Sequence, residues 1–274
     1  MKKVLFLLTI FFISFSPISS ASTNANLENG CNFIDIDESQ KVTLLKKQHS
    51  SPEELYKNAQ NNISYLTNEE LNIHNSAVTL QNANQKTTKK LNAISTSELI
   101  ERYSVNGVIY EEFSVTQFID ITENDLTDTI DKKLASLKPD EITPLAIDFD
   151  EDMDGSMSVR IESTNKYTKS GNCLDLESVY GTWTILDRQV SVGTKRVNYG
   201  QLGRSCKDGG SYIHNQRSSD LYPSSMSYNY TVPSSWIPVN QNADATEIGH
   251  TSTIDLTRGN SKWVFQLQNK IVLY

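Results

Sequence analysis

The chain has 274 residues, of which 37% are hydrophobic and 21% are charged, and its formal net charge is −8 at pH 7. The acidic excess lies in the first part: residues 22–155 hold 24 Asp and Glu against 11 Lys and Arg, whereas residues 156–274 hold 9 against 12. This balance excludes the strong basic field of a nucleic-acid-binding protein, so we expect no nucleic-acid partner. The length suits two small domains, or one with a long N-terminal extension.

Residues 1–21 have the organisation of a secretory signal peptide. Lys2 and Lys3 form a basic start, residues 4–15 are mostly apolar, and small residues precede a predicted cleavage after Ala21. The apolar run is too short to span a bilayer comfortably, and no later stretch approaches about 20 apolar residues. We therefore expect a secreted, extracellular protein with no transmembrane segment in the mature chain.

Residues 22–142 are predicted to form an acidic, mainly helical region. Ser51-Pro52-Glu53-Glu54 has the pattern of a helix N-terminus, in which Ser51 is the N-cap and Pro52 takes the first helical position. Thr67 and Glu70 stand at the spacing of a second capping box. Each pattern predicts the start of one helix.

The clearest helical pattern of this region comes near its end. Thr122 is predicted as an N-cap, apolar residues recur every three or four positions over residues 126–137, and Pro139 stops the helix. Residues 98–103 are a further short helical candidate. Residues 105–118 alternate too loosely to decide between strand and helix.

From residue 143 onward the pattern changes to short strands separated by turns. Strands are predicted over residues 156–163, 179–186, 189–199 and 228–232, with a turn at Gly193 and a long polar loop over residues 203–220. Residues 143–274 are therefore predicted to form an antiparallel β-sandwich-like domain. The predicted fold class is α+β, with the helical region preceding this β domain.

The end of the chain is predicted to form a β-hairpin. Residues 250–257 and 261–268 are the strands, and Gly259-Asn260 is the two-residue turn. Counting outward from the turn places Leu256 opposite Trp263 on one face, an apolar one, while the other face is mostly polar. Residues 271–274 are predicted as a separate short strand.

Three cysteines in an exported chain allow one intramolecular disulfide and leave one thiol. Cys173 and Cys206 both lie in the strand-rich part, so we favour a disulfide between them. Cys31 would then be free or bonded to another chain, and the other pairings stay open.

Residues 150–156 resemble the first half of an EF-hand-type calcium loop. Asp150, Asp152 and Asp154 take alternate positions before Gly155, and the carbonyl of Ser156 could add a ligand. The second half departs from the pattern, because Ile161 stands where a bidentate Glu is expected. We therefore expect either a looser calcium site, with calcium as the one candidate cofactor, or an acidic turn without metal.

Aromatic residues gather before the terminal hairpin. Tyr228, Tyr230 and Trp236 could form an exposed face that stacks on a glycan, and they are the candidate ligand-binding residues. The alternative is packing within the sheet. A group of basic residues at positions 195–217 could favour an anionic surface such as a wall polymer or lipid headgroups.

The sequence has no recognisable catalytic motif. It lacks a Gly-x-Ser-x-Gly elbow, a His-Glu-x-x-His pair, a Cys-x-x-Cys zinc pair, a phosphate loop and a dinucleotide fingerprint. A Cys206–His214 catalytic pair is conceivable, but export favours a disulfide at Cys206 and nothing supplies a third, orienting group.

These observations favour a secreted, non-catalytic protein whose C-terminal β domain binds an unknown extracellular or cell-surface partner. A first alternative is an acidic pro-region that masks a membrane-active β domain, as in a toxin or an antimicrobial protein, and that is removed by cleavage near residues 138–156. A second alternative is a secreted hydrolase with a carboxylate pair that leaves no short motif.

Overall fold

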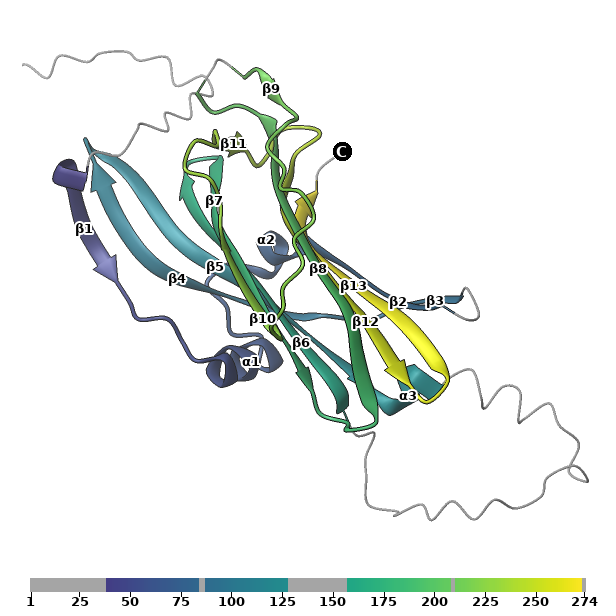
Figure 1. Cartoon of the computed structure of the whole chain (residues 1–274). Helices are drawn as coiled ribbons and strands as arrows, with labels where there is room; N and C mark the ends of the chain where they lie inside the picture. Colours follow the sequence, from purple (N-terminus) through teal and green to yellow (C-terminus); the bar gives the residue numbers. More distant parts are fainter. Residues whose placement is uncertain (1–37, 84–86, 128–156, 208–209, 273–274) are drawn as a thin grey trace, which may run out of the picture. The chain divides into compact units, whose positions relative to one another are not determined.

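Antiparallel strands make up most of the residues that the computed structural model describes, which are residues 38–83, 87–127, 157–207 and 210–272 (Figure 1). Among these residues, the helices are η1 (Glu38–Gln40), α1 (Pro52–Gln60), α2 (Asn68–Ile73) and α3 (Glu123–Thr127), and the strands are β1 (Lys41–Lys46), β2 (His74–Asn82), β3 (Thr87–Lys90), β4 (Ile94–Val105), β5 (Val108–Thr122), β6 (Met157–Ser170), β7 (Cys173–Ile185), β8 (Val190–Arg204), β9 (Tyr212–Ile213), β10 (Ser227–Thr231), β11 (Val239–Asn240), β12 (Glu247–Arg258) and β13 (Ser261–Val272).

The strands form two sheets. Sheet A has the order β1-β4-β5-β6-β7-β10, and the short strand β11 pairs with β7 beside it. Sheet B has the order β3-β2-β13-β12-β8-β9. Buried residues of both sheets form a common apolar core, among them Ile161 and Trp183 from sheet A and Ile254 and Phe265 from sheet B. Sheet A and sheet B therefore pack on each other through this core (Figure 1).

Both halves of the sequence build both sheets. In sheet A, β5 pairs with β6 along its length, and in sheet B, β2 pairs with β13. The boundary predicted between residues 142 and 143 therefore does not separate a helical region from a β domain. The first half of the sequence supplies strands to each sheet.

The prediction of a mainly helical first half is wrong for residues 94–122, which form the hairpin of β4 and β5. Asn106 and Gly107 both have positive φ angles, 52° and 83°. Two such residues in a row are what a two-residue hairpin turn requires, and Asn-Gly is a favoured sequence for it. Within residues 98–103, the short helical candidate, Glu101 is buried and its carboxylate lies 3.0 Å from the ammonium of Lys41 on β1.

The three α-helices begin where the sequence predicts. Ser51 Oγ accepts a hydrogen bond from Glu54 N, and Thr67 and Glu70 form a complete capping box. At the third helix, Asp125 Oδ2 accepts hydrogen bonds from both N and Oγ1 of Thr122. Helices α1 and α2 are short because the chain turns into a loop after Gln60 and into strand β2 at His74, whereas residues 128–142 of the predicted long helix lie outside the described residues. In the described ranges, no helix combines the length and apolar character that crossing a membrane requires.

The terminal hairpin has the predicted register. Leu256 lies opposite Trp263 and Ile254 opposite Phe265, with Gly259-Asn260 as the turn. The prediction of a separate last strand is wrong, because β13 continues without a break to Val272 and pairs with β12 throughout. Gly193 is likewise not a turn: it lies inside β8, where the pairing with β12 shifts register between Ile254 and Leu256.

The long loop after β8 is tied to both sheets. The predicted disulfide between Cys173 and Cys206 is present and joins the start of β7 to this loop. The buried side chain of Gln201 accepts from Leu176 N and donates to Ile237 O, and Gln216 donates to the same Ile237 oxygen. A covalent link and a network of amides therefore hold a segment that has little regular structure of its own.

Candidate functional site

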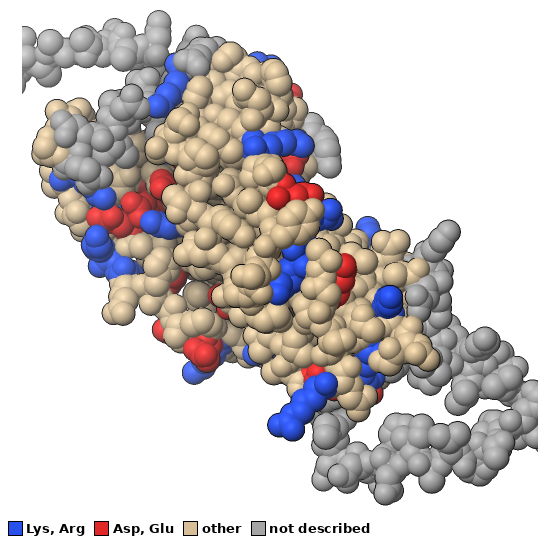
Figure 2. All heavy atoms as spheres, in the orientation of Figure 1, with Lys and Arg blue, Asp and Glu red and all other residues tan. Residues whose placement is uncertain are grey.

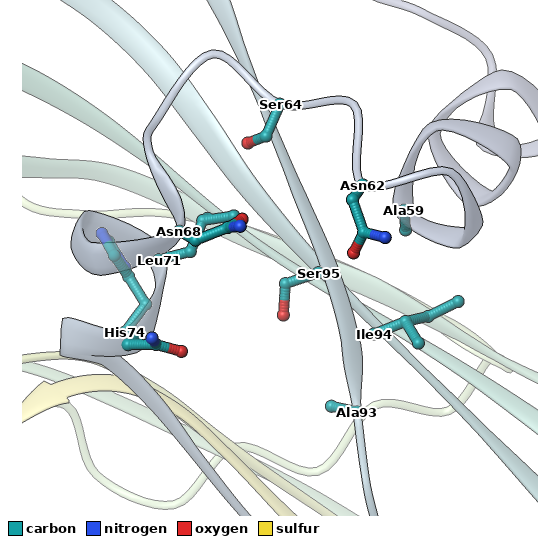
Figure 3. Close-up of a pocket in the computed structure, with 10 residues that line it drawn as sticks. Ala59, Asn62, Ser64, Asn68, Leu71, His74, Ala93, Ile94 and Ser95 are labelled. Atoms are coloured by element: carbon teal, nitrogen blue, oxygen red, sulfur yellow. The ribbon is translucent and has the colours of Figure 1, made fainter.

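A cavity of about 440 Å³ lies between the segment after α1, helix α2 and the start of β4. Figure 3 shows the side chains of Asn62, Asn68 and Ser95 directed into this space from different sides. The polar lining consists of Asn62, Ser64, Asn68, Asn72, His74 and Ser95. We call this space the amide pocket.

The outer wall of the amide pocket is bonded to β4. Leu66 N donates to Ser97 Oγ at 2.7 Å, and the hydroxyls of Ser64 and Ser97 lie 2.6 Å apart. Tyr65 N donates to the Ser97 carbonyl at 2.9 Å, and Thr96 Oγ1 donates to the Ile63 carbonyl at 2.7 Å. Residues 63–66 are thus held by several hydrogen bonds, so the cavity has a fixed wall.

Helix α1 positions the other side of the pocket. Its residues Leu55 and Ala59 pack on Phe118, and Tyr56 meets Phe118 edge to face with ring centroids 5.3 Å apart. The guanidinium of Arg160 lies 3.7 Å from the centre of the Tyr56 ring, a favourable cation–π contact. These contacts fix α1 on the face of sheet A that points away from sheet B (Figure 1). The next turn places Asn62 in the left-handed region with φ 54°, which Asn tolerates better than most residues.

His74 forms the inner limit of the amide pocket. His74 is the C-cap residue of α2 and the first residue of β2. It is 6% exposed, and its ring meets the Tyr167 ring edge to face. Burial lowers the pKa of His74 to about 4, so the imidazole is neutral near pH 7. Among the residues that the structure describes, none bonds its Nδ1 atom. That nitrogen is itself buried, so the neutral imidazole forms part of the wall between the amide pocket and the core.

A second histidine stands in a fully bonded cluster between the sheets. His250 Nε2 lies 2.9 Å from Ser163 Oγ and 2.7 Å from the Tyr228 hydroxyl, and Nδ1 lies 2.6 Å from Asn165 Oδ1. Asn165 Nδ2 donates to the Asn269 carbonyl, so its Oδ1 is the acceptor and His250 Nδ1 carries the proton. Nε2 is then the acceptor for the two hydroxyls. We call this group the His250 cluster.

The His250 cluster interrupts the apolar core along β6, β12 and β13, the last through Asn269, which stands between Leu267 and Ile271. On β6 it separates Ile161 from Tyr167, and on β12 it separates Ile254 from Ile248, so that each pair belongs to two different apolar clusters. Gly249 lets the strands approach here, since a Cβ at its position would lie 2.2 Å from the Asn269 carbonyl. Asn and Ser on the inner face of β6 therefore have partners for their polar groups from sheet B.

The order of groups from Ser163 through His250 to Asn165 matches nucleophile, base and orienting residue of a hydrolase. All three residues are 0% exposed, however, and burial lowers the pKa of His250 to about 3. A substrate cannot reach the Ser163 hydroxyl in this fold. We therefore assign the cluster to the stability and specificity of the core.

The predicted calcium ligands Asp150, Asp152, Asp154 and Ser156 lie outside the described residues. Within the described part of the chain, no group of three or more His, Cys, Asp or Glu side chains is placed to hold a metal ion. The calcium site stays a prediction.

The predicted aromatic ligand face is not formed as a surface. Tyr228 is buried in the His250 cluster, 6% exposed, with its ring 4.9 Å from that of Trp183. Tyr230 and Trp236 are half-buried and both pack on Tyr199. The physical reason is that Tyr228 belongs to the core and that Tyr230 and Trp236 pack against it, as the packing alternative assumed.

Two of the basic residues at positions 195–217 are paired with acidic neighbours. Arg196 lies 3.5 Å from Asp220, and Arg217 lies 3.2 Å from Glu247. Figure 2 shows acidic and basic side chains close together on one face of the molecule. This pairing weakens the expectation of an anionic surface as partner.

Sequence reasoning missed the amide pocket. The signal available to it was the recurrence of Asn at positions 58, 61, 62, 68 and 72, around two short helices with strong N-caps. Asn is unusual in helices but common where side chains bind ligands or turns, and no pattern shows which.

Comparison of the chain with known protein families, curated proteins and solved structures found no match.

Proposed function

We propose that this protein is an exported, non-catalytic binding protein, and that the amide pocket takes one neutral unit of a cell-surface saccharide. The observation that carries this proposal is a cavity of about 440 Å³ lined by amides, hydroxyls and a neutral histidine, with no charged side chain among the lining residues. Its volume lies in the range of small-molecule sites.

The chemistry of the lining selects the class of ligand. An Asn amide donates from its nitrogen and accepts at its oxygen, so Asn62 and Asn68 can bond hydroxyl and acetamido groups from two sides. Leu71 and Ile94 supply limited apolar contact, which suits a sugar ring better than an apolar ligand. A binding role also fits the single titratable side chain of the lining, because acid–base hydrolysis of a glycoside usually needs two.

Export is supported by the disulfide, since Cys173–Cys206 would not persist in a reducing cytoplasm. The pro-region alternative receives no support from the fold. Removal of the first half would take β5 away from β6 and β2 away from β13, and so open both sheets.

The test uses saccharide binding by the full mature chain and by a double variant, Asn62→Gly with Asn68→Ala. Gly accepts the left-handed backbone of residue 62, and Ala suits the first helical position at 68, so the fold should persist. A screen of neutral saccharides, followed by titration calorimetry with an N-acetylhexosamine disaccharide, should show binding that the double variant loses by at least about tenfold.

The matched control is Asn229→Ala, an exposed asparagine on the edge strand β10. It removes the same amide from a position outside the pocket and should leave the affinity unchanged. Failure of every neutral saccharide to bind, or equal binding by the double variant, would refute the proposed function.

A further inference from the structure

A second cavity of about 260 Å³ adjoins His74 from the other side of α2. Asn68, Leu71 and Asn72 of this helix line the amide pocket, whereas Glu70 lines the second cavity, and His74 lines both. The remaining polar lining comes from Lys169, Asn172, Gln241 and Asn242. Unlike the amide pocket, this cavity is charged.

The two charged groups of the second cavity are held differently. Glu70 Oε2 accepts hydrogen bonds from N and Oγ1 of Thr67 in the capping box, which, with the positive charge of Lys169, lowers the pKa of this carboxyl. Lys169 Nζ lies 3.7 Å from Glu70 Oε1, which is longer than a hydrogen bond. The ammonium can therefore donate to a second anion without releasing Glu70 from its cap.

The amide-bearing wall of the second cavity is fixed by the backbone. Gln241 N donates to the Asn172 carbonyl at 2.8 Å, and Asn242 N donates to Asn240 Oδ1 at 2.9 Å. Asn172, Gln241 and Asn242 line the cavity together with Lys169. Such a set of amides beside one ammonium suits peptide groups that end in a carboxylate.

We infer that the amide pocket and the second cavity form one extended site, whose ligand is a saccharide that carries an amino-acid or short peptide substituent with a free carboxylate. The sugar occupies the amide pocket, the substituent passes His74, and its carboxylate binds Lys169. His74, which lines both cavities, lies at the junction between the two parts. This inference rests on the proposed function and names the ligand class of the same site.

The experiment compares three probes on the full mature chain: a neutral N-acetylhexosamine disaccharide, an N-acylated muramic acid linked to an alanyl-isoglutamine dipeptide, and that dipeptide alone. The substituted sugar should bind more tightly than the neutral disaccharide by on the order of tenfold, because it adds a charge-assisted hydrogen bond. Lys169→Met should remove this gain and leave the neutral disaccharide affinity unchanged.

Lys166→Met is the matched control. Lys166 lies on the same strand, its side chain is 27% exposed against 23% for Lys169, and it pairs with Glu112 at 2.8 Å. This variant should bind all probes as the parent does. Lys169→Gln, with thermal unfolding measured for each variant, separates loss of charge from loss of fold.

Two results would overturn the extended site. One is equal affinity of the parent for the neutral and the substituted sugar, which would leave the proposed function standing. The other is an equal loss of both sugars in Lys169→Met and Lys169→Gln, which would make Lys169 part of the amide pocket's structure. Absence of binding by all three probes would instead count against the proposed function itself.

Discussion

His250 and His74 are both buried in the interior, and burial lowers the pKa of each well below that of a free histidine. They differ in their partners. Both ring nitrogens of His250 are bonded, to Asn165 on one side and to Ser163 and Tyr228 on the other. His74 borders two cavities and has a nitrogen without a partner in the described structure. A buried group whose polar atoms are all bonded stabilises a core, whereas one with an unbonded polar atom carries an uncompensated cost of desolvation.

Replacing each imidazole ring in turn is the strongest test of this difference between His250 and His74. His250→Leu should lower the free energy of unfolding by about 4 kcal/mol, because the Asn165 oxygen and two hydroxyls are left buried with a partner lost. His74→Leu should cost about 1 kcal/mol or less, since it removes a group with an unpaired nitrogen. Urea denaturation at pH 7 measures both. Equal losses would mean that His74 is as much a structural residue as His250.

Acidification should destabilise the protein through the same two rings. An unfolded histidine takes up a proton near pH 6.5, whereas folded His74 does so only at about 4 and His250 at about 3. The unfolded state therefore binds more protons below pH 6.5, and stability falls as the pH is lowered. Protonation of His74 accounts for about 3 kcal/mol of this loss in the free energy of unfolding between pH 6.5 and 4.

Unfolding free energies of the parent and of His74→Gln over this pH range provide the measurement. Glu70 and Lys169, which face His74, shift its pKa in opposite directions. The variant should show a shallower slope. If the slope of the unfolding free energy against pH were unchanged in the variant, a group other than His74 would cause the loss of stability.

Asp175 offers a smaller effect of opposite sign. Burial raises the pKa of this carboxyl to about 6, although the Gln201 amide donates to it at 2.8 Å. The folded state therefore binds more protons than the unfolded one between about pH 4 and 6, and stability falls as the pH rises through this window.

Asp175→Asn removes this charge and keeps an acceptor for Gln201. It should stabilise the protein by about 2 kcal/mol at pH 7 and change little at pH 4. Thermal unfolding at the two pH values is the measurement. A variant that loses stability at pH 7 would show that the carboxylate, and not burial, dominates at this position.

Features set by neighbouring residues could be read from the sequence. The N-caps at Ser51 and Thr67 depend on atoms three residues apart, and the terminal hairpin depends on a two-residue turn with alternating side chains on each side. The Asn106-Gly107 dipeptide is a local hairpin-turn signal of the same kind, but the interpretation of residues 105–118 did not use it. The choice of Cys173 and Cys206 followed from their place in the strand-rich part, and the structure confirms it.

The tertiary structure alone decided which segments meet. Ser163 and His250 are 87 residues apart in the chain, and the periodicity of either strand shows only that both face inward. The pairing of β2 with β13 joins residues near opposite ends of the described chain, so helix-like composition in the first half was overridden by partners that no local pattern names. The amide pocket likewise exists only because α1, α2 and β4 converge, since a cavity is a property of packing and not of spacing along the chain.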